Sequence, residues 1–151
     1  MAWIGAAKAP AGCIFCDAWS TDDDRRHLVL TRSEHAFLIL NAYPYASGHL
    51  MVALKRHLAA VTDASVAELA DAMALVQRTV TALGREYRPE GYNIGMNQGR
   101  AAGAGIADHL HIHVVPRWSA DSNFMHTTAD VRVLPETLDQ TWQRLRGRLD
   151  G

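Results

Sequence analysis

This sequence has few cysteines, few phenylalanines and almost no net charge. The 151 residues include only two cysteines and three phenylalanines, and fifteen basic residues nearly balance sixteen acidic ones, for a formal net charge of −1. Such a chain has no general affinity for the nucleic-acid backbone or an anionic membrane, and no basic stripe with interleaved aromatic residues is visible. We therefore expect no nucleic-acid partner, and phosphate binding must come from a local site.

Long apolar runs and linker-like segments are missing as well. No apolar stretch approaches the length of about 20 residues that a bilayer requires, and residues 1–12 have no basic start ahead of an apolar run. We expect no membrane partner, no signal peptide and a cytoplasmic location. With 48% hydrophobic residues, no internal repeat and no Pro/Gly-rich linker, the chain has the size and composition of one domain with one core.

Two cysteines are too few for a disulfide framework, and their spacing, Cys13-Ile14-Phe15-Cys16, suggests a metal instead. The pair suits two thiolate ligands of one Zn²⁺, but redox pairs have the same spacing. A redox pair usually follows a strand and opens a helix, whereas the residues around Gly12 predict a loop. Zinc is therefore the favoured interpretation, and it requires further ligands from elsewhere in the chain.

The most informative segment is His109-Leu110-His111-Ile112-His113-Val114-Val115, in which three histidines alternate with apolar residues. In a strand, successive side chains point to opposite faces, so the histidines would share one face and the apolar residues the other. Imidazole binds metal, transfers protons or acts as a nucleophile near neutral pH. A solvated polar face would also alternate, but such faces usually carry Thr, Lys, Glu or Ser, so the row predicts a functional site.

Local patterns predict five strands and two helices. The expected strands are Leu28–Thr31, Ala36–Asn41, His49–Leu54, Gly91–Asn97 and His109–Val115. A long helix is expected from about Asp63 to Tyr87, with a capping box at Ser65-Val66-Ala67-Glu68, and a second helix over Pro135–Leu149. The core-facing stripe of the long helix is predicted to be Leu69, Met73, Val76, Val80, Leu83 and Tyr87. This order of elements predicts an α+β fold with an antiparallel sheet.

The histidine row, followed by Pro116-Arg117 and preceded by Asn97-Gln98-Gly99, closely resembles the signature of the histidine triad (HIT) family of nucleotide hydrolases and transferases. The segment from Phe37 to Val52 is similar to the pair of central strands in that family, and the resemblance extends from Cys13 to about Trp118. It implies an antiparallel five-stranded sheet with one long helix and a C-terminal helix, and a homodimer that shares one sheet. A single HIT domain over residues 1–151 follows, with its core at about 13–118 and a C-terminal segment at 119–151.

The resemblance also implies chemical roles for the histidines. His111 would be the nucleophile that forms a nucleotidyl-histidine intermediate, and His113 would donate to phosphate oxygens or to the bridging oxygen. In zinc-bearing relatives, two histidines complete the cysteine pair as ligands of a structural zinc. Here the complete set would be Cys13, Cys16, His57 and His109. A catalytic zinc held by the three histidines is the rival interpretation, and no organic cofactor is expected.

Five further residues are expected at the substrate by the same resemblance. Asn41 would contact the ribose hydroxyls, His49 would lie near the phosphates, and Asn97 would supply an amide on the phosphate side. Their alternatives are a turn-initiating asparagine, a structural histidine and a loop cap. Gly103 and Gly105 would offer backbone N–H groups to phosphate, although a flexible connection is the alternative. The family usually has Gly-Gln-Ser or Gly-Gln-Thr here, and this chain lacks it.

Features outside the triad favour one branch of the family. Asn41, the Tyr43-Pro44-Tyr45 turn and Pro116-Arg117-Trp118 are similar to bacterial diadenosine tetraphosphate phosphorylases and hydrolases. We therefore expect cleavage of a phosphoanhydride in a diadenosine polyphosphate, with Arg100 and Arg117 as candidate cations near the phosphates. A nucleoside 5′-phosphoramidate hydrolase is the alternative enzyme. A nucleotide-binding or metal-storing protein without turnover is the alternative outside catalysis.

Overall fold

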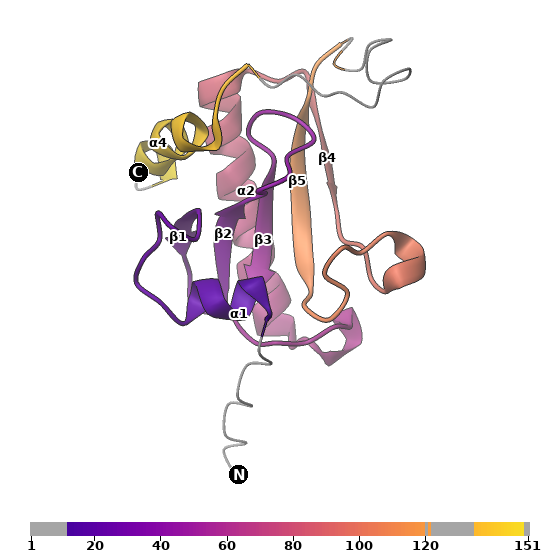
Figure 1. Ribbon diagram of the computed structural model, residues 1–151. Helices are drawn as coiled ribbons and strands as arrows, with labels where there is room; N and C mark the ends of the chain where they lie inside the picture. The colour runs from indigo at the N-terminus through magenta and orange to yellow at the C-terminus, as the bar shows by residue number, and fades with distance from the viewer. Residues whose placement is uncertain (1–11, 120, 122–134, 150–151) are drawn as a thin grey trace.

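The computed structural model describes residues 12–119, 121 and 135–149, which contain one antiparallel sheet of five strands (Figure 1). The strands are β1 (Val29–Arg32), β2 (Ala36–Leu40), β3 (Leu50–Leu54), β4 (Gly91–Gly95) and β5 (His111–Arg117), in the spatial order β1-β2-β3-β5-β4. All four strand pairs are antiparallel. The predicted α+β class and the five predicted strands are confirmed, with boundaries that shift by one or two residues at most ends.

The described residues contain the two predicted helices and three further helical segments, one short α-helix and two 3₁₀ turns. They are α1 (Ile14–Trp19), the 3₁₀ turns η1 (Val61–Asp63) and η2 (Arg100–Ala102), the long helix α2 (Val66–Tyr87) and α4 (Leu138–Leu149). None of these helices combines the length and the apolar character needed to cross a bilayer. The second predicted helix corresponds to α4, which begins at Leu138 rather than Pro135. Within the C-terminal segment, residues 122–134 lie outside the described residues.

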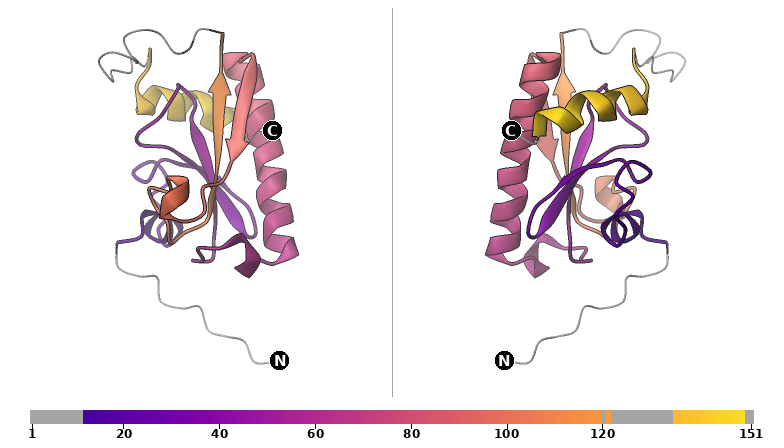
Figure 2. Two further views of the ribbon diagram at one scale, coloured as in Figure 1. Left: turned by 90° about the vertical axis from the view of Figure 1, so that its right-hand side faces the viewer. Right: turned by 90° about the vertical axis from the view of Figure 1, so that its left-hand side faces the viewer.

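An apolar layer covers each face of the sheet. The central strands β2 and β3 are therefore buried on both sides. In the edge-on views of Figure 2, α2 lies against one face and α1 lies on the other. Along β2, Leu38 belongs to the layer under α2, whereas its neighbours Phe37 and Ile39 belong to the layer under α1. This alternation continues on β5, where Ile112 faces α2. The histidines between these apolar residues therefore face the α1 side.

The long helix begins at the predicted capping box and buries most of the predicted stripe, since Val76 and Leu83 are buried and Val80 and Tyr87 pack against the core. The Ser65 side chain accepts a hydrogen bond from the Glu68 backbone N–H, and the Glu68 carboxylate accepts one from the Ser65 N–H. Met73, which we predicted to be in the core, is 48% exposed. The buried hydrophobic positions are Ala72, Leu75, Val76, Ala82 and Leu83. The two alanines were not part of the predicted stripe, because alanines carry little weight in an apolar-stripe search.

The loop that we predicted around the two cysteines is wrong, because Cys13 caps helix α1 and Cys16 lies within it. A helix of six residues is too short to show a clear apolar period, and it is not stable by propensity alone. The Arg32 guanidinium fixes its C-terminal end by donating to the backbone oxygens of Ala18, Trp19 and Thr21 at 2.8–2.9 Å. A tertiary contact from β1 therefore determines a helix that the local sequence does not indicate.

Candidate active site and metal centre

The three histidines lie along β5 and at its entrance, on the face covered by α1. His109 precedes the strand, His111 pairs in register with Ala53 of β3, and His113 pairs with Met51. Ala53 and Met51 belong to the apolar layer under α1, so the histidines lie on that same face of the sheet. The predicted common face is therefore present, although the predicted strand start at His109 is two residues early.

The ring of His111 has a defined tautomer. Its Nδ1 lies 2.8 Å from the backbone oxygen of His109, and a carbonyl oxygen can only accept, so Nδ1 must carry the proton. The lone pair of the neutral ring is then on Nε2. Within the described residues, the hydrogen bond of the His111 ring is made by Nδ1, so the lone pair of Nε2 is not committed to a protein donor. The geometry leaves this nitrogen available to a reacting group.

Burial keeps His111 uncharged at neutral pH. The side chain is 4% exposed, and desolvation lowers its pKa below the ordinary 6.5, although the hydrogen bond to the His109 oxygen acts in the opposite direction. A protonated imidazole has no lone pair on either nitrogen and cannot attack an electrophile. The position of His111 thus favours its nucleophilic form over the physiological pH range.

A chain of hydrogen bonds fixes the proton of His113. The Tyr45 backbone N–H donates to Nδ1 of His49 at 3.1 Å, so in neutral His49 the proton is on Nε2. That N–H donates to Nδ1 of His113 at 2.9 Å, which leaves the proton of neutral His113 on its own Nε2. Burial, aided by His111, lowers the pKa of His113 to about 4. His113 is therefore a neutral N–H donor on the same face as His111.

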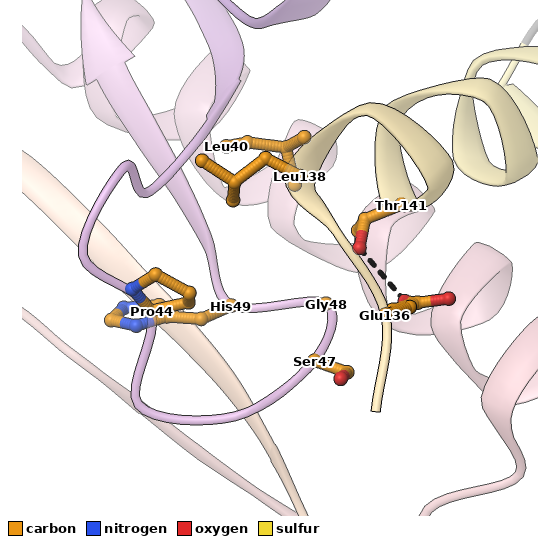
Figure 3. A pocket seen from close by; sticks show the side chains of 8 residues that line it. All are labelled: Leu40, Pro44, Ser47, Gly48, His49, Glu136, Leu138 and Thr141. Carbon is orange, nitrogen blue, oxygen red and sulfur yellow. Dashed lines mark hydrogen bonds between the residues drawn. The ribbon is translucent and has the colours of Figure 1, made fainter. Parts of the chain in front are cut away.

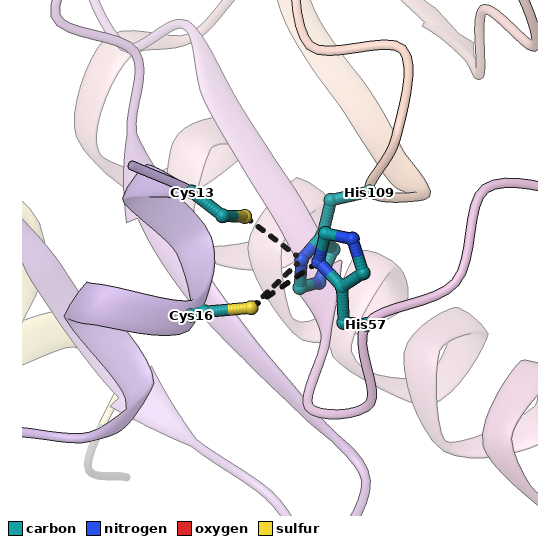
Figure 4. Close-up of side chains that lie close together, drawn as sticks. All are labelled: Cys13, Cys16, His57 and His109. Atoms are coloured by element: carbon teal, nitrogen blue, oxygen red, sulfur yellow. Dashed lines mark hydrogen bonds between the residues drawn. The ribbon is translucent and has the colours of Figure 1, made fainter. Parts of the chain in front are cut away.

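The two cysteines and two histidines come together at the N-terminal end of α1 (Figure 4). Cys13 Sγ lies 3.3 Å from Nδ1 of His109, and Cys16 Sγ lies 3.3 Å from Nδ1 of His57 and 3.6 Å from Nδ1 of His109. The four potential ligand atoms all lie within 4.8 Å of one another. Residues from three distant parts of the chain thus present two sulfur and two nitrogen atoms to one point.

This donor set fits a tetrahedral zinc ion. Bonds of about 2.3 Å to sulfur and about 2.0 Å to nitrogen place neighbouring sulfur and nitrogen atoms about 3.6 Å apart, close to the spacing found here. Nε2 of His109 lies 2.7 Å from the Leu54 backbone oxygen, so its proton is on Nε2 and the lone pair of Nδ1 points to the sulfurs. Such an outer hydrogen bond is the usual way in which a histidine ligand is oriented.

The competing interpretations of these residues fit the geometry less well. Burial is the main cause that raises the pKa of the Cys16 thiol to about 11, whereas a reactive redox cysteine has a lowered pKa. The three histidines of the row also point to three different partners, namely a cysteine, a backbone oxygen and another histidine. They do not converge on a single metal as a catalytic three-histidine site requires.

The predicted substrate residues outside the row receive uneven support. Asn41 Oδ1 accepts a hydrogen bond from the Tyr43 N–H at 2.9 Å, which is the turn alternative, and its amide nitrogen lies 3.4 Å from the His49 ring. Asn97 is exposed. The Gly103 N–H donates to the Arg100 oxygen at 3.0 Å, so it is not available to phosphate as predicted. The reason is the left-handed conformation of Gly103, which closes the η2 turn.

The two candidate cations also differ. The guanidinium of Arg117 is bound to Asp121 at 2.5 and 2.8 Å and to Asn93 at 2.7 Å, so its charge is compensated. Arg100 is exposed on η2, next to the small-residue loop. Among these two, only Arg100 is left to approach an anion without breaking an ion pair.

A pocket between the β2–β3 loop and α4 does not coincide with the histidine row (Figure 3). It is lined by Leu40, Pro44, Ser47, Gly48, His49, Glu136, Leu138 and Thr141. Neither His111 nor His113 contributes to it. We therefore locate the candidate site by the convergence of the histidines rather than by this pocket.

Three features of the site were missed by sequence reasoning. Phe15 packs its ring against His111, the Tyr45 backbone N–H orients His49, and the Leu54 oxygen orients His109. The two backbone contacts leave no trace in residue type. Phe15 could have been suspected, since it lies between the two predicted metal ligands.

Comparison with known proteins identifies the family of the chain. A family model described as the HIT domain matches residues 24–120, which is more than half of the chain. The chain belongs to the HIT domain family. Among solved structures, a Zn-bound histidine triad family protein from Mycobacterium smegmatis has a similar fold, with a TM-score of 0.72 and 28% sequence identity over 92% of this chain and 94% of that one.

Two enzymes are among the relatives of this HIT chain. An AP-4-A phosphorylase of Mycobacterium tuberculosis is 40% identical over 118 residues, which are 78% of this chain and 60% of the relative. An adenosine 5′-monophosphoramidase of Schizosaccharomyces pombe is 35% identical over 105 residues, which are 70% of this chain and 74% of that enzyme. The chain thus spans less than two thirds of the phosphorylase.

Proposed function

We propose that this HIT protein is an enzyme that cleaves nucleotides through a covalent nucleotidyl-histidine at His111. The observation that carries the proposal is the pairing of a neutral His111 with its lone pair on Nε2 and a neutral His113 with its proton on Nε2. One ring offers electrons and the next ring on the same face offers a hydrogen bond, as attack at a phosphoryl group requires.

In the proposed first step, Nε2 of His111 attacks the α-phosphorus of the nucleotide. A phosphorus–nitrogen bond forms, the phosphorus–oxygen bond to the leaving group breaks, and the electron pair of that bond goes to the departing oxygen. The Nε2–H of His113 stabilises the negative charge on the phosphoryl or bridging oxygen. In the second step, water or phosphate attacks the same phosphorus, the phosphorus–nitrogen bond breaks, and its electron pair returns to His111.

The proposed substrate is a diadenosine polyphosphate such as diadenosine tetraphosphate. The 40% identity to the AP-4-A phosphorylase supports this choice over the phosphoramidate alternative, for which the identity to the monophosphoramidase is 35%. Asn41 and His49, at the two ends of the β2–β3 loop, are proposed to contact the nucleotide, with Asn97 and Gly105 on the phosphate side. Gly103 is left out, since its N–H is used within its own turn.

A short substrate panel tests whether the protein acts on diadenosine polyphosphates or on nucleoside phosphoramidates. Diadenosine tetraphosphate with and without added phosphate is compared with an AMP-amine, each with wild-type protein and with His111→Gly. We expect turnover of the first substrate, with ADP as an added product when phosphate is the acceptor. Fast turnover of the AMP-amine alone would contradict the substrate proposal, and binding of nucleotide without any turnover would establish the non-catalytic alternative.

We also propose that Cys13, Cys16, His57 and His109 hold a structural zinc. The fit of the four donor atoms to a tetrahedron and the Zn-bound relative from Mycobacterium smegmatis support this assignment. With all four positions filled by protein, the ion has no open place for water and would fix α1 and His109 in place rather than take part in the reaction. The two free, buried thiols also suit the reducing cytoplasm that we propose as the location.

A homodimer is the proposed assembly. Strand β4 is at an edge of the sheet, its residues are half-buried or exposed, and Ile94 on it is 47% exposed. An open strand edge with an apolar side chain is suited to pairing with another strand. Sedimentation should show a dimer for the wild type and a monomer for Ile94→Lys, whereas a monomeric wild type would refute the assignment.

A further inference from the structure

The feature that the proposed function leaves unused is Phe15, which lies between the two cysteines on α1. Its side chain is fully buried, and its ring centre is 4.8 Å from that of His111 with an angle of 41° between the planes. The same ring lies 5.1 Å from that of His109 at 56°. A single phenylalanine therefore contacts both a proposed metal ligand and the proposed nucleophile.

Within the described residues, the sheet gives the His111 ring one hydrogen bond and a small cross-strand neighbour. Its one hydrogen bond, from Nδ1 to the His109 oxygen, sets the tautomer but does not by itself prevent the ring from tilting. Its cross-strand neighbour is Ala53, which presents only a methyl group. The two aromatic neighbours are Phe15 and His113, and the His113 ring lies 4.9 Å away at 68°. Phe15 thus provides an apolar surface against which the ring of His111 packs.

Phe15 itself is held from both ends of α1. At the N-terminal end, Cys13 and Cys16 contact the two histidines of the metal cluster, and at the C-terminal end Arg32 donates to three backbone oxygens. The ring also packs against Phe37 at 6.3 Å. Because six helical residues are not stable alone, these contacts fix where Phe15 lies. Side chains that are locked in this way can hold a reacting group in its productive orientation.

We propose that Phe15 is a positioning residue that holds the His111 ring with Nε2 directed toward the substrate. The inference rests on the proposed function of His111, and it assigns to α1 a second task besides carrying the two cysteines. A change at Phe15 is then expected to disturb the orientation of the nucleophile while leaving nucleotide binding nearly unchanged.

The first test observes the ring directly and does not depend on turnover. Nitrogen-15 spectra of the histidine rings of the full chain at neutral pH, with His111 assigned by a His111→Gln variant, should show one protonated Nδ1 and one unprotonated Nε2 in the wild type. Phe15→Ala should let the ring tilt away from the His109 oxygen, which breaks the hydrogen bond of Nδ1 and gives averaged signals from both tautomers, and Phe15→Leu should lie in between. Unchanged signals in Phe15→Ala would overturn the proposal.

The second test separates kcat from KM with diadenosine tetraphosphate. Phe15→Ala should lower kcat by up to about 10²-fold, the cost of a misplaced reacting group, with KM little changed, and Phe15→Leu should recover part of the loss. A rise in KM with constant kcat would show that Phe15 serves substrate binding and would contradict the positioning role.

A matched control removes the effect of lower stability. Leu75→Ala on α2 deletes a buried side chain from the apolar layer on the opposite face of the sheet. It should lower the melting temperature as Phe15→Ala does, but keep the wild-type ring spectrum and kcat. If the wild type forms no nucleotidyl-histidine, the proposed function fails, while the ring spectra still decide whether Phe15 positions His111.

Discussion

Single hydrogen bonds decide the chemistry of the histidines at the residue scale. His111 and His113 both titrate below their ordinary pKa through burial, yet opposite tautomers give them different tasks. The residue types and their alternation were sufficient to predict a common face for the three histidines, because side-chain direction in a strand follows from position alone. The tautomers could not be predicted, since backbone oxygens and the Tyr45 N–H set them.

His49 offers a direct test at this scale. His49→Phe keeps a ring of similar size but removes the Nε2–H that donates to His113, so neutral His113 can move its proton to Nδ1. We expect kcat to fall about 10²-fold, the lower range for a positioned proton donor, with a smaller change in KM. The measurement is steady-state turnover together with a melting curve. A folded variant with wild-type kcat would contradict the hydrogen-bond chain.

At the scale of the element, some helices could be predicted from the local sequence, whereas others are determined by contacts with distant parts of the chain. The capping box of α2 was predictable because Ser65 and Glu68 act three residues apart in the chain. Helix α1 was not, because Arg32 of β1 satisfies its C-terminal oxygens. The buried stripe of α2 was predicted in part: Val76 and Leu83 are buried as expected, whereas Met73 is exposed and the buried alanines Ala72 and Ala82 were missed.

Glu68 gives a prediction for stability at the scale of the element. Its carboxylate accepts from Arg56 at 2.8 and 2.9 Å and from the Ser65 N–H at 2.7 Å, and the Arg56 hydrogen bonds are the main cause that lowers its pKa from 4.5 to about 2. Because the pKa is lower in the folded state, the contribution is complete above pH 4.5 and is lost as the pH falls toward 2.

Glu68→Gln should therefore reduce the free energy of unfolding by about 1 kcal/mol at pH 7. Urea unfolding of both proteins at pH 7 and pH 3 provides the measurement, and the difference between them should shrink at the lower pH. A difference that grows on acidification would show that the sign assigned to this carboxylate is wrong.

In the described residues, the two apolar layers of the sheet meet the cluster of two cysteines and two histidines and the row of three histidines. Ligands from α1, from the chain after β3 and from the entrance of β5 meet at the cluster, so metal binding would connect segments far apart in sequence. This convergence was predicted through family resemblance. Spacing alone supported only the Cys13–Cys16 pair, because no local pattern relates His57 to His109.

Removal of the metal is the prediction at this scale. Zinc held at 100 times its dissociation constant stabilises the folded state by about 2.7 kcal/mol, so a strong chelator should lower the melting temperature by about 5–10 °C. Metal analysis should find one zinc per chain in the wild type, and Cys13→Ser should contain less and respond weakly to chelator. A metal-free wild type with unchanged melting behaviour would exclude the zinc site.

The covalent intermediate tests the central claim most directly. Wild-type protein is mixed with diadenosine tetraphosphate labelled in adenine, quenched within milliseconds at alkaline pH, where a phosphorus–nitrogen bond to imidazole survives, and digested for peptide mass analysis. We predict one AMP on the peptide that contains His111, no AMP on the same peptide of His111→Gly, and a loss of at least about 10⁴-fold in the rate of that variant. Turnover by the wild type without label on this peptide, or full activity of His111→Gly, would contradict the account.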